Sequence, residues 1–400
     1  MFRACFIILI TALPLSGIAQ SAKTALQYFE KGELALQNRD YNTALADFSE
    51  CLRLDNFYSQ AYRLRANAYE HLGEDEKALS DYNIYLHLVP ADTEALFSRA
   101  VLRFEADLYD LARKDFYDLL FLPKSETNTV FFGQEKFNDS NARIFTAHSA
   151  GKDHIFNYLG LIDTNLKSYT QAIVWFDSAI RISNQNPAYW INRGSAKLKS
   201  QDSPGALNDF NAALKLDPDN SLAIHNIATI RSAEGESSTS EKLLTQAIEK
   251  NNALPYPRAE RAYQRLQRND LAGALEDYNE VVRMEPKDGE NYLNRGLVKE
   301  KLKDLKGALA DYSKAIELDD TNEKSWVSHG NVLSKLHRWN EAIEDYSIAI
   351  SLASDYGLAY YNQAIAYQST GKLDEACNDL KKAESLGVKA NARMKERVCR

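Results

Sequence analysis

The segment NYLNRGLVKEKLKDLKGALADYSKAIELDD, residues 291–320, decides the fold. It holds a small residue at Gly296, an alanine at Ala308 and a large ring at Tyr312. The same residue types recur along the chain at one fixed spacing, with a single break. The distance in sequence from Ala308 to Ala342 is one such spacing. We call this spacing the period. A fixed period of about 34 residues is typical of paired helices that stack into a solenoid.

Three positions of the repeat carry this pattern through the whole chain. The alanine position falls on Ala44, Ala78, Ala112, Ala172, Ala206, Ser240, Ala274, Ala308, Ala342 and Ala376. Twelve residues earlier the residue is small, at Gly32, Ala66, Ala100, Gly160, Gly194, Ala228, Ala262, Gly296, Gly330 and Ala364. Four residues later it is large, at Phe48, Tyr82, Phe116, Phe176, Phe210, Leu244, Tyr278, Tyr312, Tyr346 and Leu380. Because small residues let two helices approach while the large side chain fills the space beside them, each unit is expected to be a helical hairpin.

With these positions the chain resembles the tetratricopeptide repeat family, which has a small residue in the first helix, alanine and an aromatic residue in the second, and proline near the end. Pro90, Pro218 and Pro286 occupy the proline position, and the segment AYWINRGSAKLKSQDSPGALNDFNAALKLDPDN, residues 188–220, matches closely. The resemblance covers residues 22–388 apart from one interruption. It implies an all-α fold, a right-handed α/α superhelical solenoid of about ten hairpins.

Composition agrees with this fold, since 26% charged and 44% hydrophobic residues suit amphipathic helices that share a thin core. We expect one elongated domain, because each unit of a solenoid touches only its neighbours. Its parts are repeats 1–3 at residues 22–123, an insertion at 124–152, repeats 4–10 at 153–388, and a short C-terminal segment at 389–400.

The first residues, MFRACFIILITALPLSGIAQS, predict an export signal. Arg3 precedes an apolar run at residues 4–15, and Gly17 and Ala19 have the spacing of a signal peptidase site. We expect a signal peptide at residues 1–19, cleaved after Ala19, and a periplasmic or secreted protein. The run is short for a bilayer span and contains Pro14, so no stable membrane span is expected after cleavage.

An oxidising compartment gives weight to the cysteines that follow the signal. Cys51 occupies a position that holds alanine in other repeats, as at Ala179 and Ala213, and is interpreted as a buried core residue. Cys377 and Cys399 can pair only where the C-terminal segment folds back on the last helix. The sequence leaves that bridge open.

One pairing inside the repeats joins a cation to an aspartate 16 residues later. It relates Arg65 to Asp81, Arg99 to Asp115, Arg193 to Asp209, Arg261 to Asp277 and Arg295 to Asp311, with Lys31 and Asp47 and His329 and Asp345 as variants and Gln363 with Asp379 as an exception. We predict that these pairs touch across each hairpin. The alternative is a basic stripe for nucleic acid, which a paired arginine and a net charge of −8 disfavour. No nucleic-acid partner is expected.

In the family that the chain resembles, the first helices line a concave groove, and this implies candidate contact residues. They are Phe29, Arg63, Asn67, Phe97, Val101, Phe104, His225, Thr229, Leu293, Leu297, Asn331, Tyr361 and Ile365. Mixed apolar and hydrogen-bonding groups suit an extended peptide or a partner helix, and a partly solvated face is the alternative. Some relatives clamp a C-terminal carboxylate with basic and asparagine residues. Here only Arg63 and Asn67 match, because Ser98, His154 and Tyr158 stand at the later clamp positions.

The break in the period, from Ala112 to Ala172, is longer than one period and shorter than two, so it holds one repeat and an inserted segment. That segment is polar but carries Phe131, Phe132, Phe137 and Phe145, which we expect to make contacts. It covers part of the groove, docks a partner, or acts as a helical spacer that bends the superhelix.

Residues for catalysis are not recognisable. The chain shows no phosphate-binding glycine loop and no serine nucleophile elbow, and His148 with His154 is two ligands short of a tetrahedral metal site. We expect no enzyme activity, cofactor or metal. The sequence favours a protein-interaction scaffold or adaptor in a cell envelope that binds a protein or peptide. The alternative is an auxiliary subunit of an envelope enzyme or of surface polysaccharide handling.

Overall fold

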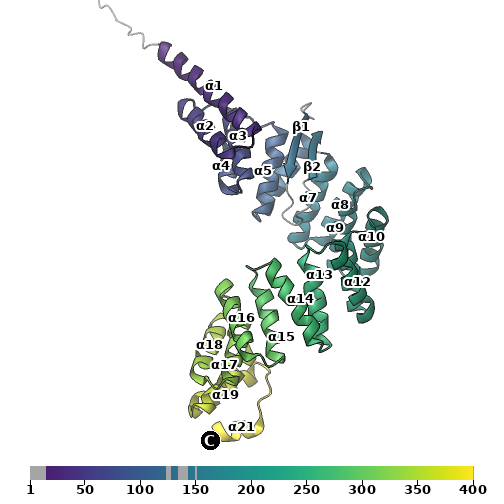
Figure 1. The fold of residues 1–400 in the computed structure, drawn as a ribbon, viewed down its shortest axis with the longest axis vertical. Coiled ribbons are helices and arrows are strands. Elements are labelled where there is room, and N and C mark those ends of the chain that lie inside the picture. The colour runs from purple at the N-terminus through teal and green to yellow at the C-terminus, as the bar shows by residue number, and fades with distance from the viewer. Residues whose placement is uncertain (1–14, 123–127, 134–142, 149–150, 400) are drawn as a thin grey trace, which may run out of the picture. The chain divides into compact units, whose positions relative to one another are not determined.

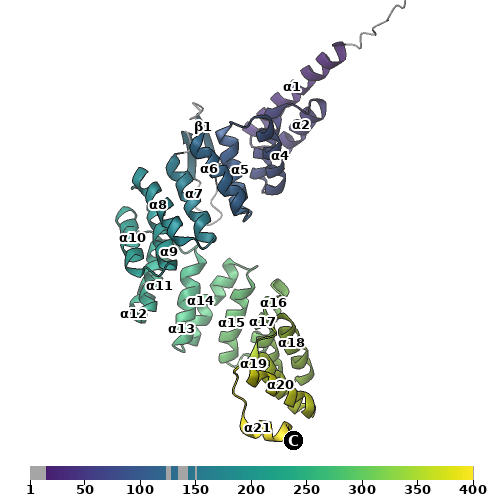
Figure 2. The same cartoon turned by 180° about the vertical axis from the view of Figure 1, so that it is seen from behind.

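The computed structural model describes residues 15–122, 128–133, 143–148 and 151–399, with the backbone alone for 15–22 and for the two short segments. Its contacts group these residues into two units that meet in sequence at Leu216 and Asp217, where the sequence analysis expects one elongated domain. Each unit is a run of helices that pair in chain order (Figure 1 and, from behind, Figure 2). The predicted all-α repeat architecture is confirmed.

Unit 1 contains ten helices and a strand pair among its described residues. The helices are α1 (Leu15–Gln37), α2 (Tyr41–Leu54), α3 (Ser59–His71), α4 (Asp75–Leu88), α5 (Thr93–Glu105), α6 (Tyr109–Phe121), α7 (Lys152–Asn165), α8 (Tyr169–Ile182), α9 (Pro187–Lys199) and α10 (Ser203–Leu216). Strands β1 (Asn128–Gly133) and β2 (Arg143–His148) form an antiparallel pair inside the predicted insertion. Strands are not expected there from the sequence pattern.

The insertion does not interrupt the packing of the hairpins in unit 1. Helix α7, which follows it, packs on α6, which precedes it. The ring of Tyr158 stacks on that of Phe116 with centroids 5.0 Å apart. Arg113 of α6 also donates to Asp163 of α7 over 2.5 Å. The solenoid core is therefore continuous from the third hairpin to the fourth.

The described residues of unit 2 form five hairpins and a short final helix. The helices are α11 (Ser221–Ala233), α12 (Ser237–Lys250), α13 (Pro255–Gln267), α14 (Leu271–Met284), α15 (Gly289–Lys301), α16 (Leu305–Leu318), α17 (Glu323–Lys335), α18 (Trp339–Leu352), α19 (Gly357–Ser369), α20 (Leu373–Ser385) and α21 (Ala392–Val398). Helix α21 packs on α20.

Every hairpin turns at the same position of the repeat, through one residue with left-handed backbone. The residues are Arg39, Gly73, Asp107, Lys167, Gln201, Gly235, Asn269, Lys303, His337 and Gly371. Where an aspartate follows, as at Asp270 and Asp304, its side chain accepts a hydrogen bond from a backbone N–H in the first turn of the second helix. The left-handed turn is common to the ten hairpins described, whereas the side-chain cap is present in only some of them and is absent from α4, α12 and α18, for example.

The small residue and the ring pack against each other as the sequence predicts. A Cβ added at Gly296 would lie 2.6 Å from Cε1 of Tyr312, closer than van der Waals contact allows. Ser240, the exception among the alanines, is fully buried and donates to the carbonyl of Ala228 over 2.8 Å. The amide of Gln264 in turn donates to Ser240 over 2.9 Å. The serine is therefore kept by a buried hydrogen-bond chain.

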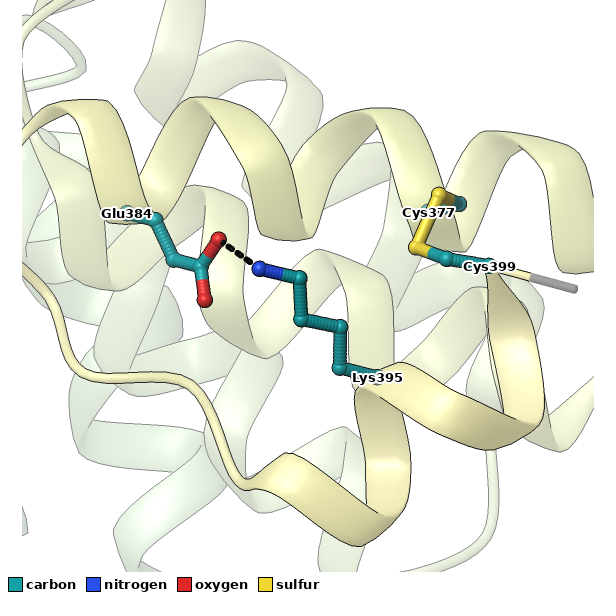
Figure 3. The surroundings of a disulfide bond; sticks show 4 residues. All are labelled: Cys377, Glu384, Lys395 and Cys399. Carbon is teal, nitrogen blue, oxygen red and sulfur yellow. Dashed lines mark hydrogen bonds and ion pairs between the residues drawn. A yellow bond between two sulfur atoms is a disulfide. The ribbon is translucent and has the colours of Figure 1, made fainter.

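Both cysteine interpretations can be compared with the structure. Cys51 is buried, as predicted, and burial raises the pKa of its thiol to about 11. Cys377 of α20 and Cys399, just after α21, form a disulfide, which settles the bridge that the sequence left open (Figure 3).

The predicted export signal lies mostly outside the described residues, which begin at residue 15. Ala19 falls within the part of α1 for which the backbone alone is described. No helix in the described part of the chain is long and apolar enough to cross a membrane.

Candidate functional site

The candidate residues lie on the first helices of the hairpins, and these helices form a layer within each unit. In unit 1 α1 touches α3 and α7 touches α9, while in unit 2 α11 touches α13, α15 touches α17 and α17 touches α19. Residues at positions i, i+3 and i+7 of a helix share one face. In unit 2 this spacing gives one stripe per first helix: 222/225/229, 256/259/263, 290/293/297, 324/327/331 and 358/361/365. We call these five stripes the first-helix surface.

Exposed apolar side chains are concentrated on three helices of this surface and extend to a fourth. Leu222 is 41% exposed, Tyr256 39%, Tyr263 51%, Leu297 38% and Leu358 50%. Of these five, only Leu297 is among the candidates predicted from the sequence. Its own period could have found Tyr263, which stands one period before Leu297, and Leu358, which begins the stripe of Tyr361 and Ile365. Leu293, by contrast, packs against the hydrophobic cluster around Tyr312.

Asn331 has a fixed orientation on this surface. Its Oδ1 accepts from the hydroxyl of Tyr346 and from the amide of Asn362, both over 2.8 Å. These two bonds use both lone pairs of the oxygen. They therefore fix which end of the side chain is the NH₂ group. That group supplies two hydrogen-bond donors on the stripe of α17, which stands between the stripes of Leu297 on α15 and Ile365 on α19 in chain order.

His225 contributes a second polar group. Its Nδ1 is buried without a hydrogen-bond partner, and burial lowers the pKa of the ring. Thr229, four residues later, donates its hydroxyl to the carbonyl of His225 over 3.2 Å. The hydroxyl of Thr229 thus serves the helix backbone, whereas the ring of His225 keeps an unused nitrogen.

The apolar candidates of unit 1 are packed into the solenoid. Phe97 and Phe104 both meet the ring of Tyr158 edge-on, with centroid distances of 5.9 and 5.5 Å. Val101 packs on the same cluster. Phe29 lies 4.8 Å from the ring of Tyr58. The structure brings three of these four candidates together, but as partners of one another and of α7.

The polar candidates of unit 1 are engaged as well. Arg63 donates to Glu94 of the next first helix over 3.3 Å. Asn67 and Tyr82 are hydrogen-bonded to Glu70, whose pKa burial raises to about 8. The folded environment of Glu70 thus favours the protonated carboxyl over the carboxylate.

The phenylalanines of the insertion fall where side chains are not described. Phe131 and Phe132 belong to β1 and Phe145 to β2, so their backbone pairing alone is known, with Phe131 opposite Phe145. Phe137 lies outside the described residues, as does the side chain of His148. The predicted insert contacts remain predictions.

The predicted cation and aspartate pairs touch in the five arginine repeats. In each, Nε and Nη2 of the arginine donate to the two carboxylate oxygens of the aspartate, as in Arg261 with Asp277 at 2.8 and 2.6 Å. His329 meets Asp345 at 2.6 Å. Two variants behave differently: Lys31 lies over the ring of Tyr28, and Gln363 donates to Ser347 and to the carbonyl of Ile343.

One of these pairs has the order of a nucleophilic triad. Nε2 of His329 lies 3.0 Å from Oγ of Ser313, and Nδ1 lies 2.6 Å from Asp345. In another repeat the same three positions hold Thr245, Arg261 and Asp277. Ser313 also lies inside α16 and donates to the carbonyl of Leu309, and backbone N–H groups within a helix are not available to an oxyanion. We interpret the trio as a structural link.

Metal ligands do not gather in the described residues: no group of three His, Cys, Asp or Glu side chains there could hold an ion. His154 contacts the hydroxyl of Tyr189 at 3.2 Å. His148, the other histidine at the end of the insertion, is described by its backbone alone.

Comparisons with known proteins agree with the repeat geometry. One tetratricopeptide repeat model matches residues 29–93 and 259–323, and another matches 358–386. Superkiller protein 3 of Schizosaccharomyces pombe is 26% identical over 237 residues, 58% of this chain and 16% of that protein. DnaJ homolog subfamily C member 3 of Rattus norvegicus is 31% identical over 100 residues, 25% of this chain and 20% of that protein. The chain spans about a fifth or less of either relative's length.

Among solved structures, the Cut9-Hcn1 hetero-tetramer of the APC/C is similar at 13% identity, with 97% of this chain and 99% of that chain covered and a TM-score of 0.47. Proteins built from such repeats act as protein-interaction scaffolds, and their fold families are generally non-catalytic. The hairpins within residues 29–93, 259–323 and 358–386 are therefore identified as tetratricopeptide repeats, and the other hairpins turn at the same position of the repeat.

Proposed function

We propose that the chain is an exported, non-catalytic scaffold or adaptor of the cell envelope, and that it binds an extended peptide or a helix of another protein on the first-helix surface. The observation that carries this proposal is the set of exposed apolar side chains in unit 2, Leu222, Tyr256, Tyr263, Leu297 and Leu358. Large exposed apolar side chains gathered on one face favour a protein partner, because their burial drives association.

The polar groups on the same surface favour a peptide. The NH₂ group of Asn331 offers donors for peptide carbonyls, and a side chain already held by two hydrogen bonds loses little freedom on binding. A net charge of −8 disfavours a nucleic-acid backbone as the partner.

Two observations support export. The N-terminal sequence has the order of a signal peptide. The disulfide between Cys377 and Cys399 is of the kind that persists in oxidising compartments such as the bacterial periplasm. Cell fractionation with thiol alkylation tests this part: we expect the mature chain outside the cytosol with one free thiol, that of Cys51. A chain found in the cytosol with its N-terminal segment retained and all four cysteines as free thiols would overturn it.

Site-specific photocrosslinking in cells tests the binding surface. A photoreactive residue replaces Tyr263, Leu297 or Leu358 on the first helices, and Ile348 or Leu352 on the second helix α18 serves as the control. The controls are 37% and 42% exposed, so they match the test positions in accessibility. We expect one protein to be captured from the first-helix positions alone.

The outcomes separate the candidate functions. Equal capture from Ile348 and Tyr263 would contradict a first-helix site. Capture of a glycan without protein would favour the auxiliary role in polysaccharide handling over the adaptor role.

A further inference from the structure

The outward side of α20 is a packing surface of the same kind that joins the hairpins. Cys377 stands one period after Ile343. Ile343 packs in one cluster with Ala359 and Ala366 of the next first helix, α19. Leu45, at the same position of the first hairpin, packs with Ala61 and Ala68 of α3. The position of Cys377 is therefore one that a following first helix normally covers.

In this chain α21 covers that surface. Val398 is 3% exposed and lies in one cluster with Ala376, Cys377 and Leu380, against which Met394 also packs. We call the α20 side of this cluster, Ala376, Cys377 and Leu380, the end face.

Two side-chain links join α21 to α20 in addition to this cluster. Figure 3 shows two links to α20, the disulfide of Cys377 with Cys399 and an ion pair of Lys395 with Glu384 at 2.6 Å. The lysine side chain is 45% exposed, so the ion pair contributes little. A helix of seven residues is too short to be stable by itself in water. The disulfide is thus the covalent restraint that holds α21 against this cluster.

The first hairpin of the chain carries the complementary position. Leu34 of α1 is 59% exposed. In the other nine repeats this position is buried, at Ala68, Leu102, Ile162, Ala196, Ile230, Gln264, Val298, Val332 and Ala366. Ala68 belongs to the cluster that contains Leu45, so this position faces the second helix of a preceding hairpin. Helix α1 therefore presents an apolar side chain that fits a surface like the end face.

We propose that the disulfide is a latch: α21 blocks the end face while the bridge is closed, and opening the bridge lets the end face accept α1 of a second copy of this chain. A dithiol reductant supplies the two electrons. Its thiolate attacks one sulfur of the bridge, and its second thiol then closes its own disulfide, leaving Cys377 and Cys399 as thiols. The contact joins two different surfaces, so it does not close on a pair and adds copies head to tail.

Sedimentation velocity of the full chain tests this inference over a range of protein concentrations, with and without a phosphine reductant. We expect a monomer when the bridge is closed. After reduction we expect a weight-average mass that rises with concentration to about twice the monomer mass or more. The double variant Cys377→Ser with Cys399→Ser should behave like the reduced chain without any reductant.

A charge introduced on α1 distinguishes this specific contact from non-specific hydrophobic association. Leu34→Lys should keep the reduced chain monomeric, whereas Leu302→Lys, at a 42% exposed leucine after α15, should not. Circular dichroism confirms that each variant is folded. Equal masses in both redox states, or association that Leu34→Lys leaves unchanged, would overturn the inference.

Discussion

Arg99 of α5 holds Asp115 of α6 through two hydrogen bonds, Nε to Oδ2 at 2.9 Å and Nη2 to Oδ1 at 2.8 Å. The aspartate is 1% exposed. The remaining nitrogen, Nη1, donates to Asn83 of α4 in the preceding hairpin over 3.0 Å. One guanidinium thus closes its own hairpin and links it to the one before.

Removing such an arginine should cost more than removing a surface charge. Arg295 bonds both oxygens of Asp311 and also Asn279 of the preceding hairpin. Arg295→Ala leaves the buried carboxylate with Lys299 as its remaining cation, so we expect a loss of about 3 kcal/mol in the free energy of unfolding, measured with urea. Arg283→Ala, whose side chain is 72% exposed, should cost less than about 0.5 kcal/mol. Equal losses in the two variants would show that the link is not structural.

The sequence predicted one half of this arrangement and missed the other. Arginine and aspartate recur at fixed positions, so their spacing of 16 residues is visible in the letters. The partner in the preceding hairpin changes in type from repeat to repeat, through Ser49, Asn83, Asp177, Thr245 and Asn279. Any residue with an acceptor oxygen can accept the hydrogen bond from the arginine Nη1. The position therefore has no fixed residue type that could be recognised in the sequence.

The turn of each hairpin offers a test of backbone conformation. Gly371 has a φ of 81°, and a Cβ added there would meet no atom within 4 Å. Gly371→Ala should therefore lower stability through its backbone alone, by about 1 kcal/mol. Gly371→Asn should lose less, because asparagine tolerates this conformation and stands at the same position as Asn269. Thermal unfolding of both variants measures the difference, and an alanine variant as stable as the parent would contradict the assignment.

The sequence predicted which helices carry the candidate residues, but not which of their side chains are exposed. The period places Phe97, Val101 and Phe104 on a first helix, as it places Tyr263 and Leu297. The first three are covered because Tyr158 of α7 reaches their cluster across an insertion whose length hides that neighbour. The exposure of a first-helix side chain depends on which hairpin packs next to it. Where the insertion breaks the period, the sequence alone does not identify that neighbouring hairpin.

Glu70 should make the stability of unit 1 depend on pH. Burial raises its pKa from 4.5 to about 8, so the folded chain binds this proton more tightly than the unfolded chain. Stability is therefore highest at low pH on account of this group and falls as the pH rises from about 4.5 to about 8. Glu70→Gln should remove this slope and unfold at higher temperature than the parent at pH 8. The exposed Glu76→Gln serves as the control, and a parental slope in the Glu70 variant would contradict the prediction.

In the other repeats that carry this aspartate, the residue 16 positions earlier is a cation or histidine. Asp379 of α20 instead follows a glutamine, Gln363, at that spacing. Its Oδ2 is buried without a partner, and burial, with Glu375 nearby, raises its pKa from 3.8 to about 6. The folded chain therefore favours the proton, and this group lowers stability as the pH rises from about 4 to about 6. Gln363→Arg places a guanidinium between Asp379 and Ser347, as Arg65 lies between Asp81 and Ser49.

We expect Gln363→Arg and Asp379→Asn each to raise the free energy of unfolding by about 1 kcal/mol at pH 7, a value reduced for the partial solvation of the carboxyl. Thermal unfolding at pH 7 and pH 4 measures the gain, which should vanish for Asp379→Asn at pH 4 because the parent carboxyl is then largely protonated. A gain of equal size at both pH values would show that packing rather than charge sets the cost.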